Sequence, residues 1–204
     1  MKKSIEEHAE RFDDHATQYD DSQNSAEYMA CVDHVCRHAR ADDAVILDLG
    51  TGTGAIALTL AESAAQVIGR DISEGMMDRA REKAAQQDIE NVSFAHGSFR
   101  EPNYDGPVDT VVSNFAMHHL SDEEKREAIA TIASFNPQRF VLGDVMLFDV
   151  PDSDAEFFDP EVDDPATVGM LADALTDSGF SLTVVESISP QVGVLVAERS
   201  VGAE

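Results

Sequence analysis

Apolar and polar positions alternate along the chain in a way that predicts strands separated by helices. The run from Val45 to Leu49 is apolar apart from one carboxylate, three glycines follow at alternate positions, and apolar residues then recur at helical spacing as far as Ala61. This stretch predicts a strand, a tight loop and a helix. Strands that alternate with helices form parallel sheets, so the pattern indicates an α/β fold. Later apolar runs predict four more strands, at residues 65–71, 91–96, 109–114 and 138–147.

The N-terminal 40 residues have helical periodicity and predict a helical extension in front of the α/β core. The apolar positions are Tyr28, Met29, Val32, Val35 and Cys36. On one helix Cys31 and Cys36 would point about 140° apart, so no disulfide between them is expected and both are interpreted as packing residues.

The C-terminal part of the chain completes the α/β pattern. Residues 165–178 predict a helix with Pro165 at its first position and Gly179 after its end. Residues 180–186 and 191–198 alternate apolar and polar side chains on either side of a short turn, which predicts a terminal hairpin.

The charge of the chain is strongly acidic. Forty acidic residues stand against 14 basic ones, giving a formal net charge of −26, yet 43% of the residues are hydrophobic. This hydrophobic content predicts a folded protein with an acidic surface, as in adaptation to high salt. A halophilic source is therefore expected, and DNA or RNA is disfavoured as a partner.

We expect the thermal stability to rise between low and molar salt, because salt screens the repulsion among surface carboxylates to within a few ångströms. A thermal melt across a series of KCl concentrations measures this effect. A melting temperature that falls as salt is added would contradict the halophilic interpretation.

No apolar run approaches the roughly 20 residues of a membrane span, and the N-terminus lacks the apolar segment of a secretion signal. We therefore expect a cytoplasmic protein without a membrane partner. Residues 1–204 are interpreted as a single domain, with a helical cap over residues 1–40 and a core over residues 41–204. Nothing in the sequence indicates the oligomeric state.

The glycine loop after the first strand suits a ligand that approaches the backbone closely, at the positive end of a helix. Dinucleotide enzymes use the pattern G-x-G-x-x-G/A, which Gly50, Gly52 and Ala55 satisfy. Asp48 favours a different ligand, because a carboxylate two residues before the first glycine would repel a pyrophosphate and attract an ammonium group.

The sequence D-L-G-T-G-T-G at residues 48–54 resembles the first motif of class I S-adenosylmethionine-dependent methyltransferases. The resemblance implies a Rossmann-like, seven-stranded, mostly parallel sheet with helices on both faces and the last strand antiparallel. It also implies that Asp48 helps to hold the methionyl amine, directly or through water, while the loop faces the methionyl part and the ribose. The residues implicated are Asp48, Gly50, Thr51, Gly52 and Gly54.

Asp71 ends the second predicted strand, 21 residues beyond Gly50. At this offset in a βαβ unit an acidic side chain accepts hydrogen bonds from ribose hydroxyls. The resemblance then places Ile72 and Met76 or Met77 near the adenine, although apolar residues at the start of a helix are also common in cores.

Residues Gly97, Ser98 and Phe99 follow the third strand and are assigned to the adenine end of the site. Related methyltransferases usually carry Gly-Asp here, with the carboxylate accepting from the adenine amino group. Ser98 departs from this pattern, since it can accept a hydrogen bond but brings no charge.

The segment F-D-D-H-A-T-Q-Y-D-D, at residues 12–21, resembles an F-D-x-x-A-x-x-Y-D element that precedes the fold in small-molecule methyltransferases. The resemblance implies that Tyr19 helps to cover the cofactor. The alternative is a surface tyrosine that anchors an N-terminal helix.

The fourth strand runs into F-A-M-H-H-L-S-D-E-E-K, and this stretch resembles a group of uncharacterised methyltransferases that share H-H-L-x-D-E-E-K. Ligands of open parallel sheets bind beyond the carboxyl ends of the strands. Asn114 and Phe115 are therefore assigned to the cofactor site. His118 or His119 is a candidate general base, or else shapes the pocket.

Two helix starts carry capping signals. Ser73 is followed by Met76 at the third helical position, and Ser121 is followed by Glu124, which predicts a capping box.

Residues 149–164 carry eight carboxylates and two prolines and predict a solvated loop over the pocket. The aromatic pair Phe157 and Phe158 is a candidate for contact with the substrate. The spacing matches no calcium loop, and without a C-x-x-C pattern or clustered metal ligands no metal site is predicted.

These observations predict an enzyme that transfers a methyl group from S-adenosyl-L-methionine to a small molecule. Two alternatives are an NAD(P)-dependent oxidoreductase and a non-catalytic module that binds the cofactor. The sequence does not identify the methyl acceptor.

Overall fold

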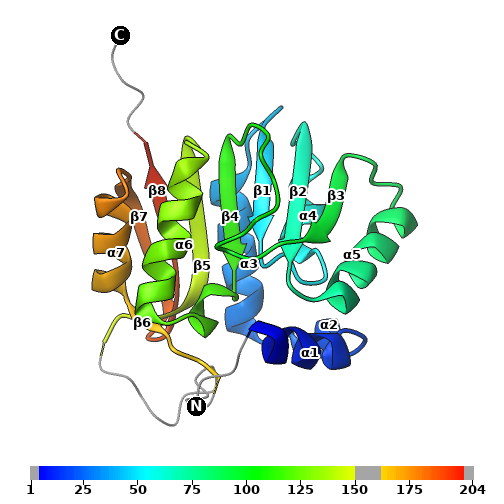
Figure 1. Ribbon diagram of the computed structural model, residues 1–204, viewed down its shortest axis with the longest axis horizontal. Coiled ribbons are helices and arrows are strands. Elements are labelled where there is room, and N and C mark those ends of the chain that lie inside the picture. Colours follow the sequence, from blue (N-terminus) through cyan, green and yellow to red (C-terminus); the bar gives the residue numbers. More distant parts are fainter. Residues whose placement is uncertain (1–4, 150–161, 200–204) are drawn as a thin grey trace.

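The computed structural model describes residues 5–149 and 162–199 (Figure 1). Seven strands form one sheet in the order β3-β2-β1-β4-β5-β8-β7, and an eighth, two-residue strand, β6, pairs with the end of β5. The strands are β1 Val45–Leu49, β2 Gln66–Asp71, β3 Val92–His96, β4 Thr110–Asn114, β5 Arg139–Leu147, β6 Ala166–Thr167, β7 Ser181–Ser189 and β8 Val192–Glu198.

The first five strands are mutually parallel, and β8 runs antiparallel to both β5 and β7. This confirms the predicted Rossmann-like sheet with an antiparallel last strand and a terminal hairpin. The helices are α1 Ile5–His15, α2 Tyr19–Ser22, α3 Ala26–Ala39, α4 Ala55–Leu60, α5 Glu74–Gln86, α6 Asp122–Ser134 and α7 Val168–Asp177, with a 3-10 turn, η1, at Met117–His119.

Neighbouring residues of β1 pack on opposite faces of the sheet, as the alternation of side chains along a strand requires. Leu47 and Leu49 belong to the core that contains residues of α6 and α7. Ile46 belongs to a second core with residues of α3 and α4. Helices therefore cover both faces, and none in the described residues is long and apolar enough to cross a membrane.

Both capping predictions are confirmed. The backbone N–H of Met76 donates to the Ser73 hydroxyl at 3.1 Å. Ser121 and Glu124 form a reciprocal capping box at the start of α6. Cys31 and Cys36 are buried free thiols, as expected for packing residues.

Three local predictions are wrong. The N-terminal segment is helical as predicted, in three helices, but Met29 of the predicted apolar face lies on an exposed face of α3, where 56% of its surface is accessible. Pro165 does not begin the following helix, because residues 166–167 pair with β5 and Thr167 caps α7. The segment between β3 and β4 is a loop rather than a helix, so the alternation of strands and helices is interrupted there.

Candidate active site

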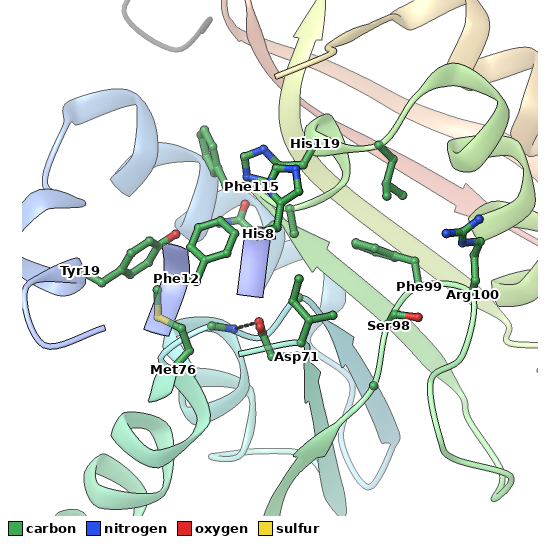
Figure 2. A pocket seen from close by; sticks show the side chains of 17 residues that line it. His8, Phe12, Tyr19, Asp71, Met76, Ser98, Phe99, Arg100, Phe115 and His119 are labelled. Carbon is green, nitrogen blue, oxygen red and sulfur yellow. Dashed lines mark hydrogen bonds between the residues drawn. The ribbon is translucent and has the colours of Figure 1, made fainter. Parts of the chain in front are cut away.

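A pocket lies at the carboxyl ends of β1, β2 and β4, where the strand order reverses. It holds about 890 Å³ of empty volume, its open mouth included. Figure 2 shows Phe12 and Tyr19 from the N-terminal helices on one side and Ser98 and Phe99 on the other. The sequence-predicted residues that line it are Tyr19, Gly50, Gly52, Asp71, Ile72, Met76, Gly97, Ser98, Phe99, Asn114, Phe115 and His119.

The glycine loop uses its glycines in two ways. Gly50, at φ 72°, is packed so tightly that a Cβ would lie 2.4 Å from Cβ of Ala116, and a Cβ on Gly54 would lie 3.1 Å from Cβ of Ala80. A Cβ on Gly52, at φ 53°, would meet no atom within 4 Å and would face the pocket. Gly52 therefore leaves a bare ledge on which a ligand can lie against the backbone.

Asp71 joins this ledge to the start of α5. The backbone N–H of Gly52 donates to Oδ2 of Asp71 at 2.8 Å, and that of Ser73 donates to Oδ1 at 2.9 Å. Burial raises the pKa of the Asp71 carboxyl. Each oxygen of a carboxylate has two acceptor positions, so Asp71 can accept further hydrogen bonds from a ligand in the pocket.

Asp48 does not line the pocket, so the structure does not agree with direct contact between its carboxylate and a ligand. It is 1% exposed, and the Thr51 hydroxyl donates to its Oδ2 at 2.7 Å. Burial, with a smaller contribution from the charge of Asp71, raises the pKa of Asp48 to about 7. Thr51 and Gly54 also lie behind the wall, because the Thr51 side chain turns toward Asp48 and Gly54 caps α4. These three residues support the loop from beneath.

The N-terminal helices are held over the pocket by two carboxylates of the F-D-x-x-A-x-x-Y-D element. Asp13 accepts from the Ser73 hydroxyl at 2.6 Å and from the backbone N–H of Gly75 at 2.9 Å. Asp20 accepts from the Thr53 hydroxyl at 2.5 Å and from Lys83 at 3.0 Å. These contacts tie the helices to the glycine loop and to α5. They also bring Phe12 and Tyr19 to the pocket, and burial raises the pKa of the Tyr19 phenol, which stays neutral.

Asp20→Ala is expected to weaken binding of the pocket's ligand by roughly 10-fold, because two hydrogen bonds to a partly exposed carboxylate are lost. Calorimetry measures the affinity, and limited proteolysis reports release of the N-terminal helices. Asp21→Ala is the matched control, since Asp21 lies next to Asp20 on α2 and its side chain is exposed. Equal affinities for the two variants would contradict a role of Asp20 in holding the N-terminal helices over the pocket.

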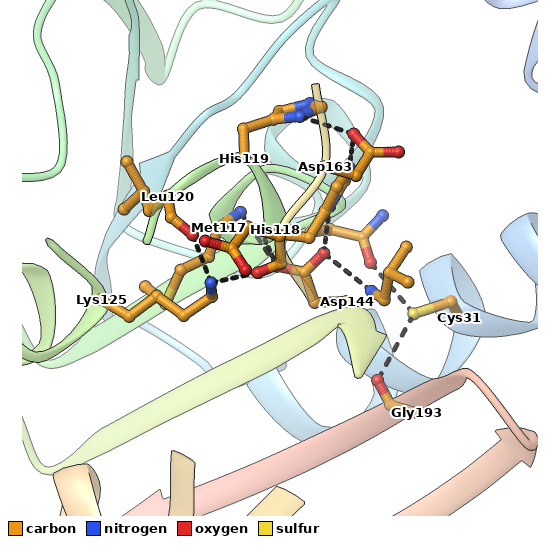
Figure 3. Close-up of polar contacts among 12 residues, drawn as sticks. Cys31, Met117, His118, His119, Leu120, Lys125, Asp144, Asp163 and Gly193 are labelled. Atoms are coloured by element: carbon orange, nitrogen blue, oxygen red, sulfur yellow. Dashed lines mark hydrogen bonds and ion pairs between the residues drawn. The ribbon is translucent and has the colours of Figure 1, made fainter. Parts of the chain in front are cut away.

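The two candidate histidines occupy different positions. His119 lines the pocket, and burial lowers its pKa to about 4, so its ring is neutral at pH 7. His118 is buried behind the wall, where its Nδ1 lies 2.5 Å from Oδ1 of Asp144 (Figure 3). The backbone N–H groups of Met117 and His118 donate to Oδ2 of Asp144 at 2.9 and 3.0 Å. A catalytic role for either histidine remains a prediction.

Five lining residues were not predicted, namely His8, Phe12, Arg100, Ala116 and Leu120. Phe12 begins the N-terminal element, and Ala116 and Leu120 lie inside the histidine motif, so these three stood within recognised motifs. Nothing in the sequence marked His8 or Arg100, whose positions depend on the packing of α1 and of the loop after β3. Phe157 and Phe158 lie outside the described residues.

A cluster of His118, His119 and Asp163 was also missed, and it bears on the prediction that the chain has no metal site. One candidate ligand atom from each residue lies within 4.8 Å of the others. Asp163 belongs to the acidic segment, whose spacing matched no known metal loop. This cluster could not be predicted from the sequence, because 44 positions separate Asp163 from His119.

Comparison with known proteins identifies the chain's relatives. Residues 46–136 match a family model described as a methyltransferase domain. An uncharacterized methyltransferase of Geobacillus sp. (strain WCH70) is 34% identical over 177 residues, which cover 84% of this chain and 78% of the relative.

Two solved structures share the fold. The [4+2]-cyclase SpnF matches with a TM-score of 0.81 at 15% identity, over 98% of both chains. Magnesium protoporphyrin IX methyltransferase from Synechocystis PCC 6803, solved with bound SAH, matches with a TM-score of 0.73 at 24% identity, over 85% of this chain and 84% of that one.

Proposed function

The chain belongs to the class I S-adenosylmethionine-dependent methyltransferases, and on this premise we propose that it methylates a small molecule held between the N-terminal helices and the turn at residues 117–120. As a member of this family it is an enzyme that uses S-adenosylmethionine. The alternatives of an NAD(P)-dependent oxidoreductase and a non-catalytic binding module do not agree with this membership.

The residues of the pocket fit the methyl donor. We assign the bare ledge at Gly52 to the methionyl part and Asp71 to the ribose hydroxyls, since Asp71 is buried at the pocket wall with acceptor positions to spare. Ile72, Met76 and Phe99 offer apolar contacts to the adenine, beside Gly97 and Ser98. The bound sulfonium supplies an electrophilic methyl group, so the chain's own task is to orient an acceptor and exclude water.

The observation that carries the proposal is the enclosure of the pocket's far end. Side chains from α1 and from the turn after β4 meet there, and the rings of Phe12 and His119 lie 5.5 Å apart. The other residues at this end are His8, Phe115 and Leu120. The N-terminal helices that contribute His8 and Phe12 are tied down by Asp13 and Asp20, which favours an acceptor small enough to fit beneath them. The net charge of −26 opposes a nucleic-acid acceptor.

A screen for methyl transfer tests the proposal. Small amines, thiols, phenols and quinones are incubated with the enzyme and S-adenosylmethionine in molar salt, and the demethylated product is measured. We expect turnover with at least one class, and a large loss of turnover with the Asp71→Ala variant at the same concentration of S-adenosylmethionine. Activity on RNA, DNA or a protein, with no activity on any small molecule, would overturn the proposal.

A further inference from the structure

We propose that His118, His119 and Asp163 form a binding site for one first-row transition-metal dication of the Zn²⁺ type, next to the acceptor end of the pocket. Two imidazoles and one carboxylate are ligands that Zn²⁺ and Fe²⁺ use in sites that keep an open coordination position. The position of the ion beside the acceptor rests on the proposed function, whereas ion binding itself does not.

The spacing of the ligand atoms agrees with such an ion. Oδ1 of Asp163 lies 3.7 Å from Nε2 of His118 and 3.0 Å from Nδ1 of His119. Ligands at about 2.0–2.1 Å from a tetrahedral centre stand about 3.3 Å apart, between these two distances. Little movement is therefore needed to bring these pairs around an ion.

Asp144 supplies the outer support that a metal-bound histidine requires. Its carboxylate lies 2.5 Å from Nδ1 of His118, which fixes the ring and turns Nε2 toward Asp163 (Figure 3). A carboxylate behind a ligating histidine sets the tautomer and increases the basicity of the other ring nitrogen. Asp144 is itself held by two backbone N–H groups, so the support is rigid.

Asp163 is held in place by its neighbours. The backbone N–H of Asp164 donates to the carbonyl of His118 at 2.7 Å. The ammonium group of Lys125, which is 2% exposed, donates to the carbonyls of Leu120 and Asp164. The segment that carries Asp163 is thus fastened to the histidine turn by contacts that do not use the Asp163 side chain.

The three ligand atoms are directed toward a common point. When Nδ1–H of His118 donates to Asp144, the Nε2 lone pair is directed toward Asp163 and is available to an ion. The buried Nδ1 of His119 lies 3.0 Å from the same carboxylate oxygen. An ion among them would be bound by all three groups, and His119 would place it at the pocket wall.

Equilibrium dialysis of the untagged full chain with Zn²⁺ in molar KCl tests the proposal, since the salt suppresses loose binding to surface carboxylates. We expect one tightly bound ion per chain, with Co²⁺ giving the visible absorption of a tetrahedral site. Asp163→Asn and His119→Gln are each expected to weaken binding at least about 10-fold.

His38→Ala is the matched control, because His34, His38 and Glu186 form a separate cluster of histidines and a carboxylate away from the pocket. This variant should bind the ion as the wild type does. Circular dichroism confirms that each variant is folded. An affinity unchanged by Asp163→Asn and His119→Gln, or no tight binding by the wild type, would overturn the metal site. Neither outcome involves the methyl donor, so the proposed methylation would stand.

Discussion

Asp71→Ala is expected to weaken the binding of S-adenosylmethionine by roughly 10²- to 10⁴-fold. The substitution removes two charge-assisted hydrogen bonds to the ribose hydroxyls, each contributing about 1.5–3 kcal/mol. It also frees the backbone N–H of Gly52, which Asp71 holds at 2.8 Å, so the ledge loses its support. Isothermal titration calorimetry measures the change in affinity.

The fold should tolerate this substitution. Burial raises the pKa of Asp71, because the ionised carboxylate loses its contact with water in the folded protein. Replacing Asp71 by Ala removes this desolvation cost, which offsets part of the stability lost with its hydrogen bonds. Asp78→Ala, which removes an exposed carboxylate on α5, the helix that follows Asp71, is the matched control and should bind normally. An affinity for Asp71→Ala within twofold of the wild type would remove Asp71 from the site.

Gly52→Ala is expected to reduce the affinity for S-adenosylmethionine by roughly 5- to 150-fold while the protein stays folded. The added methyl group meets no protein atom within 4 Å, so it projects into the space assigned to the ligand, where overpacking costs about 1–3 kcal/mol. The positive φ of 53° adds a strain of about 1–2 kcal/mol to the folded state. Calorimetry and thermal melts separate the two effects.

Gly179→Ala is the control for backbone strain. Its φ is 86°, its added Cβ would lie 3.7 Å from the nearest atom, a nitrogen of Arg199, and it is remote from the pocket. It should lose similar stability and bind the ligand normally. If Gly52→Ala also binds the ligand normally, the ligand does not bind against the backbone at Gly52.

Most of the parallel strands could be predicted from the sequence because they are short apolar runs, and β1, β4 and β5 are buried on both faces of the sheet. Four of the five parallel strands begin one residue later than the apolar pattern predicts, and the pattern also located the terminal hairpin. Pro165 was wrongly assigned to the first position of a helix, because proline is favoured there and also fits the residue before a strand. The pairing of residues 166–167 with β5 is a long-range contact that local propensity does not contain.

The site was predictable where a motif lies at the end of a strand, as for Gly52 and Asp71. It was not predictable where long-range packing decides, as for His8, which reaches the pocket only because α1 docks on α5 through Asp13. Asp48 shows the limit of motif reasoning. Its place two residues before the first glycine suggested contact with an amine, but the Thr51 hydroxyl occupies one of its oxygens and burial keeps it behind the loop.

Calorimetric titration of the wild-type protein with S-adenosylmethionine, with its demethylated product and with NAD, in molar salt, tests most directly whether the ledge at Gly52 and the carboxylate of Asp71 form a sulfonium-nucleoside site. We expect the methyl donor and its product each to bind with one molecule per chain, and NAD to give no signal. Binding of NAD alone would contradict a sulfonium-nucleoside site.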